Sequence, residues 1–300
     1  MRVLIAGASG FLGSALKRAL VGDNHHVVSL VRRPRADDSS TQWDPIAGII
    51  PPLDPFALDA VVNLAGENIA GGRWSTARRR RIRESRVRST EILCEAFRQM
   101  STPPKKLINA SAVGFYGDRG NERLTESSAA GTGFLAEVSQ EWEGAAGVAA
   151  KMGIRVVLMR FGMVLGLEGG ALPRMLPAFG FGLGGRLGSG KQYVSWVEVN
   201  DAVTAIRHVL ENDRIDGPVN LVAPQPVTNA ELTKTLAQTL GRPSVLPAPV
   251  WALRLALGAM ATELLLASTK AVPERLLNSD FTFAHPSLES ALQFLLSKRV

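Results

Sequence analysis

The stretch GASGFLG, residues 7–13, is the feature that most constrains the fold of this chain. It places Gly7, Gly10 and Gly13 between an apolar run, residues 2–7, and an amphipathic run that follows. These runs are typical of a buried strand and a helix. Glycine lets the backbone approach a ligand, and the unpaired N–H groups at a helix N-terminus favour a pyrophosphate. The pattern predicts a dinucleotide-binding turn, with a simple tight turn as the alternative.

Further apolar runs alternate with helical patterns along the chain. Such alternation predicts a parallel sheet covered by helices on both faces. The expected fold class is therefore α/β, a doubly wound parallel sheet of the Rossmann type. The expected strands are at 26–32, 59–66, 106–113 and 155–162, and the expected helices at about 75–99, 133–152 and 200–212.

The second half of the chain is richer in turn residues. Glycines crowd residues 162–190, which indicates long loops and short helices. We expect an NAD(P)-binding Rossmann domain over 1–225, with substrate-side loops at about 165–195. A smaller, mainly helical C-terminal region, 226–300, should lie on the substrate side.

One apolar run, residues 249–268, is long enough to raise the question of a membrane span. It contains Arg254 and Glu263, whereas a spanning helix needs about 20 nearly uninterrupted apolar residues. We therefore interpret it as a helix that packs in the core, and we expect no membrane partner.

Composition narrows the function classes. Charged residues make up 20% and hydrophobic residues 46%, which is ordinary for a globular enzyme. The single cysteine, Cys94, excludes an internal disulfide, and four scattered histidines give no metal-ligand spacing. The first residues lack the apolar core of a signal peptide. We expect a metal-free cytoplasmic protein.

A basic block supplies much of the formal net charge of +7, because seven of the eleven residues from Arg78 to Arg88 are arginine. Basic clusters can bind nucleic acid. No aromatic interleaving, helix-turn-helix pattern or zinc spacing accompanies this one, so we expect no nucleic-acid partner. A solvated helix start, or part of a pocket for an anionic cofactor, explains the block better.

Helical spacing separates Arg86 from the other arginines. At about 100° per residue it shares a stripe with Ile82, Ser89 and Leu93. A charged residue in a buried stripe is rarely unpaired. We expect Arg86 to face an anion such as a cofactor phosphate, with an ion pair to Asp or Glu as the alternative.

The end of the second expected strand selects the dinucleotide. An acidic residue here would bind the ribose 2′-OH of NAD. The sequence instead has Arg32 and Arg33, and arginine matches a 2′-phosphate in charge and geometry. The two residues predict NADP(H) as the cofactor, unless they are merely solvated.

Several phrases resemble those of a known superfamily. GASGFLG, VVNLAG (61–66) and SAVGFYG (111–117) are similar to motifs of the extended and atypical short-chain dehydrogenases/reductases. NLAGENIAGGRW (63–74), MRFGMVLG (159–166) and GSGKQYVSWVEVND (188–201) narrow the resemblance to an epimerase family of NADP-dependent oxidoreductases. AVPERLLNSDFTFAHPSLESAL, near the C-terminus, resembles the terminal domain of that family.

The resemblance implies a set of cofactor contacts. The pyrophosphate would be contacted by Gly7, Ser9, Gly10, Phe11, Leu12 and Gly13. The 2′-phosphate would face Arg32, with Arg33 as a second candidate, and the adenosine ribose would be lined by Leu64, Ala65 and Gly66. A further cofactor contact would come from Arg86, and the nicotinamide end would lie near Arg160, Phe161 and Gly162.

The sequence departs from the superfamily at the catalytic pair. A Tyr-x-x-x-Lys pair is expected on the helix at 133–152, but Phe134 is followed four residues on by Val138, and Leu135 by Ser139. Neither register supplies the pair, so the usual proton relay is missing.

Other side chains could serve the substrate side. Ser111 and Tyr116 are candidate catalytic hydroxyls; the alternatives are a strand-terminating serine and a tyrosine in an exposed turn. Lys191, Gln192 and Trp196 are candidates for substrate contact.

The sequence leads to two candidate functions for the protein. The first is an NADP(H)-binding oxidoreductase or epimerase-like enzyme acting on an unidentified small molecule. The second is a non-catalytic NADP(H)-binding protein with a regulatory or redox-sensing role, which the missing Tyr/Lys pair favours. The sequence leaves the substrate, the direction of hydride transfer and the oligomeric state open.

Overall fold

The computed structural model describes residues 1–33 and 40–298. Within these ranges the core is a seven-stranded parallel sheet in the order β11-β7-β5-β4-β1-β2-β3, which confirms the expected doubly wound α/β class. β1 lies between β2 and β4, so the strand order reverses there, and this switch point is where open α/β sheets bind ligands. The strands are β1 (Arg2–Ala6), β2 (His26–Val31), β3 (Thr41–Gln42), β4 (Ala60–Asn63), β5 (Lys106–Ala112), β7 (Arg155–Phe161) and β11 (Gly217–Leu221).

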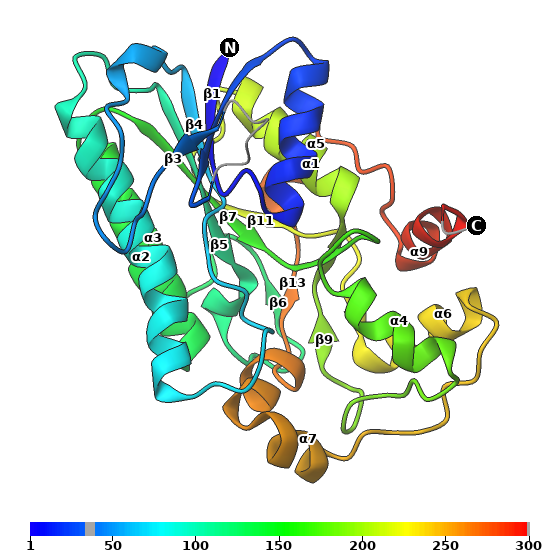
Figure 1. Cartoon of the computed structure of the whole chain (residues 1–300). Helices are drawn as coiled ribbons and strands as arrows, with labels where there is room; N and C mark the ends of the chain where they lie inside the picture. Colours follow the sequence, from blue (N-terminus) through cyan, green and yellow to red (C-terminus); the bar gives the residue numbers. More distant parts are fainter. Residues whose placement is uncertain (34–39, 299–300) are drawn as a thin grey trace.

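Helices cover both faces of this sheet (Figure 1). Alternate side chains of β1 explain how: Val3 and Ile5 belong to the apolar core that α1 and α5 cover, and Leu4 and Ala6 belong to the core that α2 and α3 cover. A strand buried on both sides needs such a continuous apolar run. The four helices are α1 (Phe11–Gly22), α5 (Val199–Glu211), α2 (Thr76–Gln99) and α3 (Phe134–Ala150), close to their expected bounds.

A second lobe lies beyond the sheet, at the right of Figure 1. Its helices α4 (Leu172–Gly180), α6 (Asn229–Thr239) and α9 (Leu288–Ser297) share an apolar core with Trp196. Segments from both sides of residue 225 therefore build this core. The division of the chain at that residue remains a prediction.

Short strands line the space between the sheet and the second lobe. The pairs are β8 (Met163–Leu165) with β10 (Trp196–Glu198), β9 (Tyr193–Val194) with β12 (Val227–Thr228), and β6 (Arg123–Leu124) with β13 (Lys270–Ala271). The structure also contains the short turns η1 (Asp54–Phe56) and η2 (Val113–Tyr116), and the short helix α8 (Glu274–Leu277).

The apolar run at 249–268 does not form the single core helix expected from the sequence. It divides into α7 (Val250–Leu257) and a π-helical turn, η3 (Ala261–Leu265), because Gly258 adopts a φ of +62° between them. No residue of α7 is buried, and Trp251 and Leu255 are 70% and 71% exposed. In the described ranges, no helix has the length and apolar character needed to cross a membrane.

Candidate cofactor and substrate site

The glycine turn connects β1 to α1 and packs against Leu64, the residue that follows β4. Gly7 has a φ of +84°, and a Cβ on it would come within 2.9 Å of the Leu64 carbonyl carbon. A Cβ on Gly13 would lie 2.2 Å from the Gly7 oxygen, and the Gly10 amide donates to that same oxygen at 3.0 Å. Side chains are therefore excluded at Gly7 and Gly13, and the backbone itself forms the floor of the switch point.

The N-terminus of α1 opens onto this turn. Its first intrahelical bond runs from the Ser14 amide to the Gly10 oxygen at 2.8 Å, and no side chain caps the helix. The first turn also holds no acidic residue. The N–H groups of Phe11, Leu12 and Gly13 thus retain their positive partial charge, which suits a pyrophosphate.

Arg86 lies beside this opening. A Cβ on Gly66 would come within 3.3 Å of the guanidinium carbon of Arg86. The guanidinium donates to the carbonyl oxygens of Ile82 and Glu67, both at 3.0 Å, and lies 5.3 Å from the Trp142 ring centroid. Burial lowers the pKa of Arg86 to about 10, so the side chain stays charged at neutral pH.

No carboxylate of the described residues lies within 4.0 Å of the Arg86 guanidinium, although the charge of Glu67 acts on it from further away. Within residues 1–33 and 40–298 Arg86 makes no ion pair, and the Glu67 carboxylate lies 3.8 Å from Arg78 instead. The structure therefore shows no direct ion pair at Arg86 within these residues, and its role toward a cofactor stays a prediction. A partly buried guanidinium whose partners are two carbonyls and the Ser85 hydroxyl keeps its full charge and is suited to accept an anion.

The other arginines of the block are mostly paired. Arg83 lies 3.1 Å from Glu141, and Arg88 lies 3.2 Å from Glu95. Arg32 and Arg33 differ from these, since both are exposed directly after β2 and make no ion pair with any described residue. β2 adjoins the glycine turn, because the Gly7 amide donates to the Leu30 oxygen at 3.2 Å.

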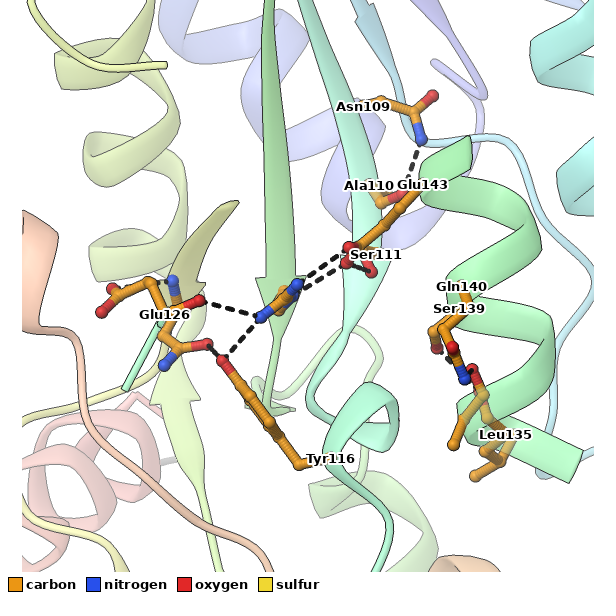
Figure 2. A network of polar contacts seen from close by, with 12 residues as sticks. Asn109, Ala110, Ser111, Tyr116, Glu126, Leu135, Ser139, Gln140 and Glu143 are labelled. Carbon is orange, nitrogen blue, oxygen red and sulfur yellow. Dashed lines mark hydrogen bonds and ion pairs between the residues drawn. The ribbon is translucent and has the colours of Figure 1, made fainter. Parts of the chain in front are cut away.

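A polar network joins the carboxyl ends of β5 and β7 to α3 (Figure 2). Ser111 donates to Glu143 Oε1 at 2.6 Å. Arg160 binds both oxygens of the same carboxylate, through Nε at 2.8 Å and Nη2 at 2.9 Å. Burial alone would lower the pKa of Arg160, but the hydrogen bonds and charge of Glu143 outweigh it and raise the pKa. This bidentate pair fixes Ser111 and Arg160 relative to each other.

Tyr116 is not in an exposed turn, contrary to the sequence expectation; it is fully buried. Its hydroxyl donates to Asn220 Oδ1 at 2.7 Å and accepts from Arg160 Nη1 at 2.9 Å. Burial raises the pKa of Tyr116, which the neighbouring Arg160 charge opposes. The hydroxyl is thus engaged within the protein, while its catalytic role remains a prediction.

The first turn of α3 is apolar where the superfamily would carry its tyrosine and lysine. Phe134 and Val138 pack in one cluster with Trp74, Ile82 and Met260. The side chain of Ser139, in the other register, is buried and donates to the Leu135 carbonyl. Hydrophobic packing therefore surrounds Phe134 and Val138, and the absence of the proton relay stays a prediction.

The residues predicted for the substrate side fall into different environments. Lys191 is exposed, whereas Gln192 is buried and donates to the carbonyls of Leu187 and Leu265. Trp196 is fully buried in the second lobe and donates to the Gln225 carbonyl at 3.0 Å. Lys191 is thus the one of the three with an exposed side chain.

The nicotinamide-side candidates lie along the end of β7. Phe161 packs against the sheet core, and a Cβ on Gly162 would come within 2.6 Å of the Ser195 oxygen. Because Gly162 has no side chain, the end of β7 can pack against Ser195, which lies between β9 and β10.

Sequence reasoning missed Glu143 and Asn220. Glu143 falls on the buried stripe of α3 with Ser139 and Ala146, so the helical spacing that singled out Arg86 would also have found it. Asn220 gave no such signal, because its partner Tyr116 is 104 residues away.

The described residues contain no group of histidine, cysteine or acidic side chains that could hold a metal ion. A doubly wound sheet with a glycine turn at its switch point, and an open helix N-terminus above that turn, defines a dinucleotide-binding protein of the Rossmann class.

Comparison with known proteins identifies the family. The model of the NAD dependent epimerase/dehydratase family matches residues 3–222, and the domain of unknown function DUF1731 matches residues 248–295. The chain belongs to the NAD dependent epimerase/dehydratase family, as the sequence resemblance implied.

Similar proteins span the whole chain. The epimerase family protein Mb2239 of Mycobacterium bovis is 44% identical over 99% of this chain and 98% of its own. The crystal structure of human epimerase family protein SDR39U1 with NADPH is 33% identical, with a TM-score of 0.91 over 99% of both chains. A nucleoside-diphosphate sugar epimerase from Corynebacterium glutamicum is 36% identical, with a TM-score of 0.81 over 99% of this chain and 58% of its own.

Proposed function

We propose that the chain binds NADP(H) at the switch point and acts as an oxidoreductase or epimerase-like enzyme on a small molecule, without the usual Tyr-x-x-x-Lys pair. The observations that carry this proposal are the uncapped N-terminus of α1 and the partly buried Arg86, which packs against Gly66 and has no carboxylate of the described residues within 4.0 Å. The crystal structure of human SDR39U1 with NADPH supports the same cofactor.

The chain's own residues fit the cofactor as follows. The backbone of the glycine turn and the first N–H groups of α1 would hold the pyrophosphate, because a Cβ on Gly7 or Gly13 would clash with backbone. Arg32 and Arg33 would face the 2′-phosphate, and Arg86 would neutralise a further phosphate charge. When bound, NADP(H) supplies or accepts the hydride.

The remaining residues would orient the substrate. Arg160 and Ser111 are held by Glu143, so the carboxyl ends of β5 and β7 form a rigid wall. The paired arginines of α2 support the expected absence of a nucleic-acid partner. We also propose a reducing, cytoplasmic location, in line with the single buried thiol of Cys94.

The cofactor proposal is tested by fluorescence titration of NADPH and NADH into the wild type and Arg32→Asp. NADPH should bind about tenfold or more weakly to the variant, with little change for NADH. Arg214→Asp, an exposed arginine just before β11, is the matched control and should leave both affinities unchanged. Equal weakening of the two dinucleotides by Arg32→Asp would sink the 2′-phosphate assignment.

A second candidate function is a non-catalytic, redox-sensing NADP(H)-binding protein. The apolar cluster around Phe134 and Val138 favours it, because no proton donor stands where the superfamily places one. Oxidation of NADPH across a panel of carbonyl compounds and nucleotide sugars separates the two. Tight NADPH binding with no turnover on any compound would favour the sensor.

A further inference from the structure

Lys270 and Tyr193 come together from distant parts of the chain. Lys270 Nζ lies 4.5 Å from the centroid of the Tyr193 ring. Tyr193 belongs to β9 and Lys270 to β13. The sequence has two tyrosines, and the other, Tyr116, is committed to the buried network at Arg160. Tyr193 is therefore the remaining phenol.

This pair is anchored at the carboxyl edge of the sheet, on the β5 side. Thr269, next to Lys270, donates through its amide to the backbone carbonyl of Tyr193 and through its hydroxyl to the backbone carbonyl of Gly117, both at 3.1 Å. Gly117 follows η2, which itself follows the end of β5. The pair is thus tied to the end of a strand whose last residues include Ser111.

A second anchor comes from β7. Ser195 donates to the Thr269 oxygen at 2.8 Å, and a Cβ on Gly162, directly after β7, would lie 2.6 Å from the Ser195 oxygen. Figure 1 shows β6, β13 and β9 beyond the ends of β5 and β7. Lys270 and Tyr193 therefore share the edge of the sheet where the cofactor is proposed to bind.

The Lys270 ammonium and the Tyr193 hydroxyl have no hydrogen-bond or ion-pair partner among residues 1–33 and 40–298. Lys270 is half-buried, and no carboxylate of the described residues lies within 4.0 Å of its ammonium; the Tyr193 hydroxyl likewise makes no hydrogen bond to them. Lys106 differs from Lys270: it is buried, and its ammonium donates to three backbone carbonyls and pairs with Asp213. A contact with a ring face leaves the charge and donors of an ammonium available.

We propose that Lys270 and Tyr193 form the substrate-binding pair, and that the substrate is an organic anion whose carboxylate or phosphate accepts hydrogen bonds from both. This inference rests on the proposed function, because it places the anion beside the NADP(H) site. An ammonium over the ring and the phenol O–H of that ring are two donors close to each other, and neither carries negative charge that would repel an anion. Lys191, the other lysine of the substrate-side loops, is exposed and lacks such a partner.

The test uses NADPH-saturated protein, so that added anions cannot occupy the cofactor's phosphate positions. Inorganic phosphate and malonate are the two probes, and the rise of Tm with probe concentration gives an apparent Kd. At least one probe should bind the wild type. Lys270→Gln should weaken that binding about tenfold or more, and Tyr193→Phe should weaken it less, since it removes one neutral donor. The preferred probe tells phosphate from carboxylate.

Lys151→Gln, an exposed lysine at the C-terminal end of α3, is the matched control and should behave as the wild type. The proposal is overturned if neither probe binds the wild type, if Lys270→Gln retains wild-type affinity, or if Lys151→Gln weakens the probes equally. NADPH affinity is measured first, by the nucleotide's own fluorescence, on every variant. It should stay unchanged in Lys270→Gln, which also shows that the variant folds. That titration decides the cofactor proposal separately from the anion site.

Discussion

Glu263 accepts a hydrogen bond from the Leu135 amide at 3.0 Å, so a carboxylate from η3 caps the first turn of α3. The other oxygen of the same carboxylate lies 3.9 Å from Arg79 on α2. One side chain thus ties the C-terminal segment to both helices on this face of the sheet. It does so at the turn where the superfamily would carry a tyrosine.

Replacing Glu263 with Ala should lower the free energy of unfolding by about 0.5–2 kcal/mol, because it removes the cap and a negative charge from a helix N-terminus. Urea denaturation followed by circular dichroism measures this. Glu137→Ala, an exposed position in the same helical turn, is the control and should cost about 1 kcal/mol or less. Equal losses for the two variants would show that the cap contributes nothing specific.

The Glu143–Arg160 pair should be far more sensitive to substitution. The two side chains are 10% and 5% exposed. Glu143→Ala would leave a buried guanidinium without its counter-charge, which costs about 3–5 kcal/mol. Glu141→Ala, on the exposed side of α3, removes a surface pair with Arg83 and should cost about 1 kcal/mol or less. A Glu143 variant as stable as the Glu141 variant would contradict the buried pair.

The glycine turn should tolerate no side chain at Gly13. Gly13→Ala places a Cβ 2.2 Å from the Gly7 oxygen, so the turn must open. We expect loss of NADPH binding together with a lower Tm. Gly144→Ala adds the same methyl group to α3 where nothing lies within 4 Å. It should raise stability by about 0.5–1 kcal/mol and leave NADPH affinity unchanged. Normal NADPH binding by Gly13→Ala would refute the geometry of the turn.

Acid should weaken the fold partly through Asp213. The hydrogen bond and charge of Lys106 hold the pKa of this exposed carboxyl below its ordinary value of 3.8. A lowered folded-state pKa contributes stability above the unfolded pKa, and this stability is lost as the pH falls from about 3.8 through the folded-state value. Urea midpoints of Asp213→Asn should be lower than those of the wild type at pH 7 and should approach them at pH 2.5. A constant difference at both pH values would exclude this linkage.

The parts of the fold that rest on local chemistry could be read from the sequence. The glycine turn needs its residues within seven positions, and the periodicity of α2 set Arg86 apart from its neighbours. Tyr116 was misjudged because the partners that bury it, Arg160 and Asn220, are 44 and 104 residues away. No pattern within the stretch around Tyr116 contains those partners.

The error at 249–268 has a different cause. Composition indicates how apolar a helix is, but it does not say whether another element covers it, and Trp251 and Leu255 face outward. Gly258 also permits the positive φ that ends α7, which helical periodicity alone does not reveal. The contact between Tyr193 and Lys270 could not be predicted from the sequence either. The two residues belong to β9 and β13, which are far apart along the chain, as Tyr116 is from its partners.

The pairing of β6 with β13 also dictates an order of assembly. A ribosome releases the chain from its N-terminus at roughly 5–20 residues per second, so the glycine turn, β4 and α2 emerge early. β6 has no partner until Lys270 and Ala271 have been made. The turn proposed to hold the nucleotide is therefore synthesised long before β13, the strand that completes the proposed substrate side.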